Sequence, residues 1–205
     1  RAEGLRVGLY YSLIDWHHPD FPKYNDCNHP MRGDPAYQDE KIDFDRYLAY
    51  MHGQIEELVT NYGKIDILWF DYAYDELRGE AWRATELVRM VRRHQPDVII
   101  DNRLETSGEG FGSLVTEQPA YYSGDFVSPE QILPPEGIRN VCGERVPWEL
   151  CTTMNNNWGY VPYDTNYKPA SVLIRKLVEC VSKGGNMILN VGPDATGRFP
   201  AQSCR

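Results

Sequence analysis

The chain alternates between short apolar runs and longer amphipathic stretches, and this alternation constrains the fold more than any other feature. The apolar runs are VGLYYS at 7–12, ILWF at 67–70, VIIDN at 98–102, WELCTTM at 148–154 and NMILNVG at 186–192. The stretches with helical character are 43–63, 79–95 and 171–185. Strands that alternate with helices of this length form parallel βαβ units. The sequence therefore predicts an α/β protein with parallel strands.

The predicted helices carry start and stop signals. In 43–63, apolar residues repeat at three- and four-residue steps: Leu48, Met51, Ile55, Leu58, Val59 and Tyr62. Gly63 stands where a C-terminal cap is expected, and Pro96 closes the second stretch. Gly184 and Gly185 end the third. Each helix is thus bounded by residues that cannot easily continue it.

Polar residues gather where the predicted strands end. They are Tyr11 and Ser12, Asp71, Asn102 and Arg103, Asn155 and Asn156, and Asn190. In a (β/α)8 barrel the active site is built from side chains at the C-terminal ends of several strands. A doubly wound sheet also places function at strand ends, but no glycine-rich phosphate loop follows the first strand. The pattern favours the barrel over the doubly wound sheet.

Five strands do not close an eight-stranded barrel. Either the chain folds differently, or it is the later part of a larger domain, and its abrupt ends favour the second interpretation. Residues 104–147, rich in Gly, Pro and Glu, interrupt the alternation. A connection longer than about 12 to 15 residues is usually functional or mobile.

Charge and composition disfavour several classes of partner. The chain has 21 Lys and Arg against 30 Asp and Glu, a net charge of −9, which disfavours nucleic acid and anionic membrane surfaces. No apolar run approaches the roughly 20 residues of a membrane span. The histidines show no metal-ligand spacing. The cysteines are scattered, with no Cys-x-x-Cys pair and no disulfide framework, and Cys151 and Cys180 are expected to be buried thiols.

Four segments in order, GLYYS, ILWFD, PWELCTTMNNNWGY and LVECVSKGGNMILNVGPDATGRFP, resemble the α-L-fucosidases of glycoside hydrolase family 29. The resemblance implies a distorted (β/α)8 barrel followed by a β-sandwich. Residues 1–205 would then form the catalytic barrel from about strand four to strand eight, incomplete at the N-terminus and without the sandwich. It also implies a fucosylated oligosaccharide or glycoconjugate as substrate, no cofactor, and a secreted, periplasmic or lysosomal location.

Asp71 follows the apolar run directly and stands among aromatic residues. A retaining glycosidase needs a carboxylate nucleophile and an acid about 5 to 5.5 Å from it. A strand end holds a nucleophile rigidly. By resemblance, Asp71 is the nucleophile that attacks the anomeric carbon of fucose. The alternative is a solvated turn acid or helix cap.

Three glutamates are candidates for the partner acid. Glu130 in GDFVSPEQ is the first choice because this loop resembles the one that carries the acid/base in some bacterial members of the family. Glu149 in PWELC is the second choice, since the glutamate of this strand has that role in other members. Glu117 in LVTEQPAYY comes third. The remaining glutamates would be supporting or surface carboxylates.

Four further residues match family positions that line the fucose pocket: Tyr11, Trp69, Arg103 and Trp158. Arg103 offers a fork of donors to hydroxyls, or pairs with Asp71. A structural ion pair with Asp101 or Glu105 is the alternative. Core packing is the alternative for Trp69, and Trp158 would pack against the methyl group of fucose.

Two features keep competing interpretations. The Asp15–Pro19 segment past the first strand is either a subsite for the leaving group or a solvent loop. At the level of function, the alternatives are a retaining glycosidase for another sugar and a non-catalytic carbohydrate-binding barrel fragment. A glycosidase for another sugar, such as a galactoside, remains an alternative. Recognition of a single methyl group separates two substrates by only about 1 to 3 kcal/mol.

Overall fold

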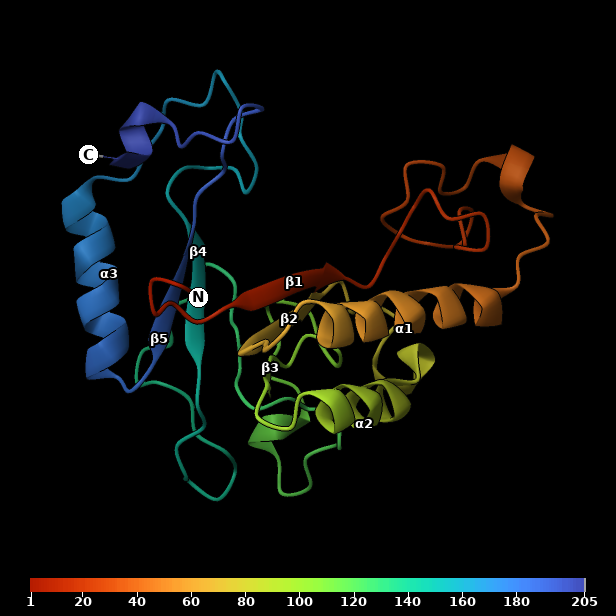
Figure 1. The fold of residues 1–205 in the computed structure, drawn as a ribbon, viewed down its shortest axis with the longest axis horizontal. Coiled ribbons are helices and arrows are strands. Elements are labelled where there is room, and N and C mark those ends of the chain that lie inside the picture. Colours follow the sequence, from red (N-terminus) through yellow and green to blue (C-terminus); the bar gives the residue numbers. More distant parts are fainter. Residues whose placement is uncertain (205) are drawn as a thin grey trace. The chain divides into compact units, whose positions relative to one another are not determined.

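The computed structural model describes residues 1–204. The chain divides into two compact units, Arg1–Ser107 and Gly108–Arg205. The first unit holds a parallel three-stranded sheet in the order β1-β2-β3 (Figure 1). Its strands are β1 (Gly8–Ser12), β2 (Ile67–Asp71) and β3 (Ile99–Ile100). Every described strand pair is parallel, which confirms the predicted α/β class with parallel strands.

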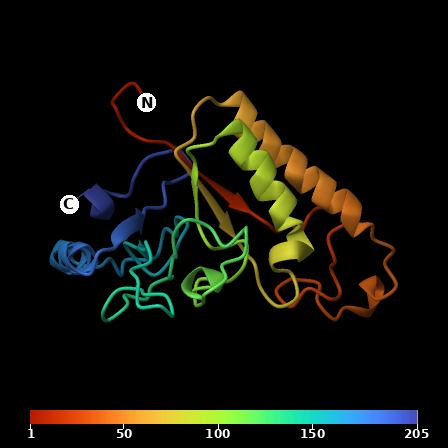
Figure 2. The same cartoon turned by 90° about the horizontal axis from the view of Figure 1, so that it is seen from below.

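Two helices cover one face of this sheet, α1 (Phe44–Asn61) and α2 (Ala84–His94). Figure 2 shows them side by side along the strands. Their contact with the sheet is an apolar core in which Met51, Ile55, Leu68, Phe70 and Leu87 are fully buried. The apolar faces that the sequence periodicity predicted therefore point toward the strands.

The helix boundaries follow local chemistry. Asp43 caps α1 by accepting a hydrogen bond from the Arg46 amide, and Gly63, with φ of +73°, turns the chain just beyond the helix. The single helix predicted for 79–95 is wrong in part. Its start is a 3-10 turn, η2 (Gly79–Trp82), and Arg83, with φ of +50°, separates that turn from α2. β3 is also shorter than the predicted strand 98–102.

The second unit is built on two parallel strands, β4 (Glu149–Thr153) and β5 (Asn186–Asn190), with α3 (Ala170–Ser182) packed beside β5 (Figure 1). Its core consists of Val127, Ile138, Val146, Trp148, Leu150 and Cys180. Cys151 and Cys180 are buried, as predicted. Three short 3-10 turns complete the elements within residues 1–204: η1 (Pro35–Tyr37), η3 (Ser113–Val115) and η4 (Ala201–Cys204).

The long 104–147 stretch contains a strand-like segment that the sequence did not reveal. Residues 127–131 run parallel to β4 through the bridges Val127–Trp148 and Glu130–Cys151. Backbone hydrogen bonds join the two segments in alternating directions. The first runs from the Val127 amide to the Pro147 carbonyl at 2.9 Å, and the last from the Gln131 amide to the Cys151 carbonyl at 2.8 Å. This segment adds a third parallel, strand-like segment to the two strands of the second unit. Within residues 1–204, no helix is both long and apolar enough to cross a membrane.

Candidate active site

Asp71 is the last residue of β2, and its backbone is held by the neighbouring strand. Ser12 is its register partner on β1, and the Asp71 carbonyl accepts a hydrogen bond from the Leu13 amide at 3.0 Å. The chain then turns sharply at Tyr72, whose φ of +74° lies in the left-handed region that bulky residues rarely adopt. Such backbone strain is concentrated at functional sites. The Asp71 side chain is 21% exposed, so that its carboxylate is both fixed and accessible.

Arg103 is the buried cation beside this carboxylate. Its side chain is 1% exposed, and Nη1 donates to Asp71 Oδ1 at 2.9 Å. The guanidinium also lies over the Trp69 ring, 4.7 Å from its centroid, as a cation–π contact. Trp69 and Asp71 are two residues apart on β2 and therefore point to the same face of the sheet. The structure thus brings three of the sequence-predicted residues together.

Tyr10 supplies the second contact to the carboxylate. Its hydroxyl donates to Asp71 Oδ2 at 3.1 Å, and its ring stacks on Trp69 with centroids 5.7 Å apart. Burial of the phenol, together with the charge of Asp71, raises the pKa of Tyr10. The hydroxyl therefore stays protonated as a donor. The sequence reasoning missed Tyr10, although its register pairing with Trp69 places it on the face of the sheet that carries Asp71.

Tyr11, the tyrosine that the sequence singled out, points to the opposite side of β1. Its hydroxyl donates to Gln54 Oε1 of α1 at 2.6 Å. Burial raises the pKa of this phenol as well. The structure does not bring Tyr11 into contact with Asp71, because alternate residues of a strand face opposite ways.

In the second unit, Glu130 and Glu149 lie on the same face of the sheet. Val127, Trp148 and Leu150 point into the core against α3, so the residues between them point away from it. The Ser128 hydroxyl donates to Glu149 Oε1 at 2.9 Å across this face. Both glutamates are half-buried.

The two glutamates differ in their height along the strands. Glu149 begins β4, whereas Glu130 pairs with Cys151, two residues further toward the carboxyl end. Gln131 follows, and its side chain bonds to Thr152 Oγ1 at 2.7 Å and Thr153 Oγ1 at 3.2 Å. Glu130 is therefore nearer than Glu149 to the carboxyl ends of the strands. Glu117 is exposed, beyond η3.

Trp158 lies on the loop after β4, with a side chain that is 40% exposed. Lys168 holds the start of this loop by donating from Nζ to the Thr153 carbonyl at 2.7 Å and the Asn155 carbonyl at 3.0 Å. Burial lowers the pKa of Lys168. The Asn155 side-chain oxygen accepts a hydrogen bond from the Asn157 amide at 3.1 Å and forms an Asx turn, so this asparagine stabilises the turn. Lys168 also escaped the sequence reasoning, because nothing local marks its contact with a strand end 15 residues earlier.

Among residues 1–204, no group of three or more His, Cys, Asp or Glu side chains is arranged to hold a metal ion. The chemistry available in the first unit is that of a carboxylate with a buried cation on one oxygen and a phenol on the other. The second unit offers two half-buried carboxyl groups on a sheet face. A carboxylate nucleophile and a carboxyl acid are the groups that glycoside hydrolysis requires.

The model of one protein family, described as alpha-L-fucosidase, matches this chain over residues 1–205. Alpha-L-fucosidase isoenzyme 1 from Paenibacillus thiaminolyticus is similar in structure, with a TM-score of 0.94 and 56% identity over 98% of this chain and 47% of that chain. Alpha-L-fucosidase AlfC from Lactobacillus casei, in complex with alpha-L-fucose product, has a TM-score of 0.75 and 31% identity over 98% of this chain and 57% of that chain. Plasma alpha-L-fucosidase of Rattus norvegicus is 28% identical over 199 residues, which are 96% of this chain and 38% of the relative. The chain thus spans less than two thirds of each of these relatives. The match of the family model along its whole length shows that the chain belongs to the α-L-fucosidase family.

Proposed function

We propose that this chain carries the nucleophile and acid/base of a retaining α-L-fucosidase, which releases terminal α-L-fucose from oligosaccharides or glycoconjugates. The observation that carries the proposal is the fixed carboxylate of Asp71, held by Arg103 on Oδ1 and by Tyr10 on Oδ2. A carboxylate oxygen accepts more than one hydrogen bond, so each oxygen keeps a lone pair. Held in this way, the carboxylate is oriented for attack.

The reaction has two displacements. In the first, an Asp71 oxygen forms a bond to the anomeric carbon of fucose while the bond to the leaving oxygen breaks and the acid gives that oxygen its proton. In the second displacement, the acid/base residue, now deprotonated, takes a proton from water. The water oxygen attacks the anomeric carbon, and the ester bond between fucose and Asp71 breaks. Fucose leaves with its anomeric configuration retained, and both carboxyl groups return to their starting states.

Glu130 is our first choice for the acid/base and Glu149 the second. Active sites of (β/α) barrels lie at the carboxyl ends of the strands, and Glu130 is the further along of the two. Glu149 has an oxygen engaged by the Ser128 hydroxyl at the amino end of β4. That position suits a supporting carboxylate. Glu117 remains the third candidate.

The sugar itself would be held by aromatic and cationic groups. Trp69 and Arg103 border Asp71 and would contact the fucose ring and its hydroxyls. We extend this set to Tyr10, which touches the nucleophile directly. Tyr11 would support the strand from the side of α1. Trp158 would pack against the methyl group of fucose.

We further propose that residues 1–205 form the catalytic barrel domain from about strand four to strand eight. The parallel order β1-β2-β3, the parallel pair β4-β5 and the likeness to solved α-L-fucosidases support this assignment. In that frame β2 carries the nucleophile at its carboxyl end, as a barrel strand does.

Trapping of the glycosyl-enzyme tests the function directly. The full-length protein is treated with a 2-deoxy-2-fluoro-fucosyl inactivator, digested, and its peptides weighed by mass spectrometry. We expect a fluorofucosyl mass on the peptide that contains Asp71, and no label in Asp71→Asn. The matching galactosyl inactivator is the control for sugar specificity. A label on another carboxylate, or none on folded protein, would contradict the proposal.

A further inference from the structure

We propose that Trp16 is a stacking platform for the sugar residue to which fucose is linked, a neutral hexose or N-acetylhexosamine. The inference rests on the proposed fucosidase function and adds a second binding site to it. It concerns the loop between β1 and α1, where the sequence left open whether residues 15–19 bind the leaving group or only face solvent. The structure favours a binding site through three observations on Trp16 and one on the neighbouring Asp15.

The first observation is the position of Trp16 along the chain. Ser12 pairs with Asp71, and the amide of the buried Leu13 donates to the Asp71 carbonyl at 3.0 Å. The Tyr47 hydroxyl fixes the Leu13 carbonyl at 2.7 Å. Three residues span at most about 11 Å. With the 3.0 Å hydrogen bond of Leu13 added, the backbone of Trp16 lies within about 14 Å of the Asp71 carbonyl at the end of β2. The residue next to the scissile bond would fit within this distance.

The second observation is that Trp16 is held in place by a buried histidine. The His29 ring is 3% exposed and meets the Trp16 ring edge-on, with centroids 5.7 Å apart. The Met31 amide donates to His29 Nδ1 at 2.9 Å, so the neutral ring carries its proton on Nε2. That nitrogen donates to the Trp16 carbonyl at 3.2 Å. Both the backbone and the ring of Trp16 are therefore anchored.

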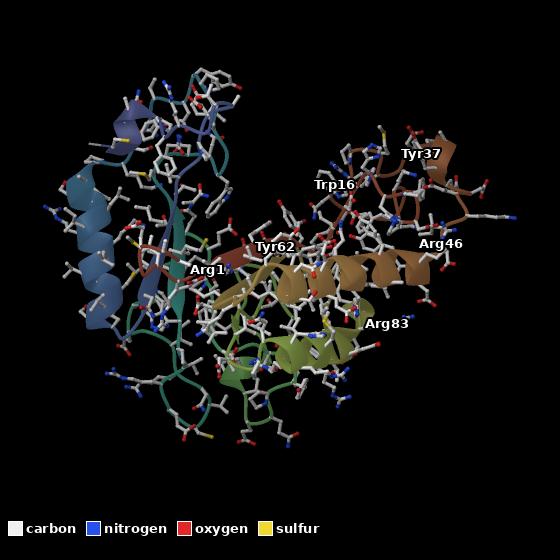
Figure 3. All side chains as sticks on the ribbon, in the orientation of Figure 1. Arg1, Trp16, Tyr37, Arg46, Tyr62 and Arg83 are labelled. Carbon is white, nitrogen blue, oxygen red and sulfur yellow. The ribbon has the colours of Figure 1, made fainter. Side chains whose placement is uncertain are left out.

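The third observation is that an anchored ring still faces outward. Trp16 is 38% exposed, whereas Leu13 and Phe21 of the same loop are fully buried. Figure 3 shows Trp16 on the part of the loop nearer to β1, with Tyr37 at the far end. A rigid ring that keeps an accessible face is suited to stacking on the apolar face of a sugar.

The residue that precedes Trp16 in the chain offers a carboxylate as the polar group that such a site needs. Asp15 precedes Trp16, and its Oδ1 accepts from the His17 amide at 2.9 Å. Its Oδ2 lies 3.4 Å from the Tyr50 hydroxyl, whose ring packs on His18 with centroids 4.6 Å apart. Remaining lone pairs of the carboxylate can accept sugar hydroxyls. Ring and carboxylate together fit a neutral sugar.

The test compares two substrates in the full-length protein and its variants. One is a fucosyl disaccharide with a hexose or N-acetylhexosamine leaving group, and the other is α-L-fucosyl fluoride, whose leaving group has no ring to stack. We expect Trp16→Leu and Trp16→Ala to lower the ratio of kcat/KM for the disaccharide to that for the fluoride by about tenfold. Trp16→Phe should lower it less. Tyr37→Ala, on the same loop, is the matched control and should leave the ratio unchanged.

The outcomes separate this inference from the proposed function. If Trp16→Leu and Trp16→Ala leave the ratio of kcat/KM for the disaccharide to that for the fluoride unchanged, Trp16 is not a stacking platform. This holds whether turnover is normal or falls equally on both substrates. Equal losses would show that the ring packs against protein. If the unaltered protein cleaves neither substrate and takes up no fluorofucosyl label, the fucosidase proposal itself fails.

Discussion

Arg103 and Asp71 form a contact between a buried cation and a half-buried anion, with Nη1 of the arginine 2.9 Å from Oδ1 of the aspartate. Asp71 ends β2, and Arg103 follows β3, so the pair joins the carboxyl ends of two neighbouring parallel strands. The Arg103 side chain is 1% exposed, so water cannot solvate its charge in place of Asp71. The orientation of the carboxylate and the stability of the first unit therefore depend on the same contact.

Replacing Arg103 by methionine is expected to destabilise the protein and abolish most turnover. Removing one partner of a buried ion pair lowers the free energy of unfolding by about 3 to 5 kcal/mol. The partial exposure of Asp71 favours the lower end of this range. The control is Arg83→Met, which removes an exposed pair with Asp45 worth at most about 1 kcal/mol. Urea unfolding measures both. Equal stability of the two variants would contradict this account.

Tyr10→Phe is expected to lower kcat/KM for a fucoside about tenfold, because a hydrogen bond to a charged group contributes about 1.5 to 3 kcal/mol and this one is partly exposed. Tyr11→Phe is the matched comparison, since it removes a hydroxyl that bonds to Gln54 instead. The two variants differ by one position on the same strand. A greater loss in Tyr11→Phe would mean that Tyr11, and not Tyr10, serves the reaction.

Glu130→Gln is expected to slow cleavage of a sugar leaving group by about 100-fold or more, the usual contribution of a general acid. The loss should be much smaller for a dinitrophenyl fucoside, whose leaving group needs little protonation. Glu149→Gln should show no such dependence on the leaving group. The measurement is kcat/KM for both substrates in both variants. If only Glu149→Gln shows the dependence, the acid/base is Glu149.

Alkaline pH should destabilise the first unit through the buried Tyr47 and the half-buried Tyr74. Burial raises the pKa of Tyr47, and burial with the Asp26 hydrogen bond raises that of Tyr74. Below pH about 10 both phenols are protonated in the folded and unfolded states, and their stabilising contribution is complete. As pH rises above 10 the unfolded state loses protons first, so the free energy of unfolding falls.

Urea midpoints between pH about 9 and about 11 measure this loss. Tyr47→Phe should reduce the slope with pH, whereas Tyr163→Phe should not, since Tyr163 is 87% exposed. Tyrosinate absorbance follows the ionisation in the same samples. Identical slopes in the two variants would exclude Tyr47 as a source of the effect.

Gly185→Ala is expected to destabilise the second unit by about 1 to 3 kcal/mol or more, because an added Cβ would lie 2.2 Å from Cε2 of Trp148. Gly53→Ala is the matched control. Gly53 lies inside α1 with nothing within 4 Å of the added methyl group, and alanine there should stabilise the helix by up to about 1 kcal/mol. Thermal unfolding of both variants shows whether they shift in opposite directions.

The sequence predicted the alternation of strands and helices because each element carries its own periodicity and stop signals. Asp71 was placed correctly at a strand end for the same reason. The break at Arg83 escaped prediction, since an arginine, unlike a glycine, does not mark a positive φ in the sequence. The segment 127–131 was missed because only its pairing with β4 makes it strand-like.

The face that a strand residue occupies is a tertiary property, and this explains the site residue that was missed. In GLYYS, Tyr10 and Tyr11 are indistinguishable by composition or alternation alone. The register with β2 decides between them by pairing Tyr10 with Trp69. In the same way, the contact of Lys168 with the end of β4 depends on how the intervening loop folds back.

The close contact of Trp148 with Gly185 changes what the SKGGN segment signifies. Gly184 turns the chain with φ of +77°, and Gly185 packs closely against the indole, so the two glycines have a structural role in the second unit. A relative that keeps these two glycines and the tryptophan would retain this architecture even after losing the acid at the end of β2. Pseudoenzymes on this scaffold would then be distinguished from active enzymes by the strand-end residues, and not by their most recognisable sequence segment.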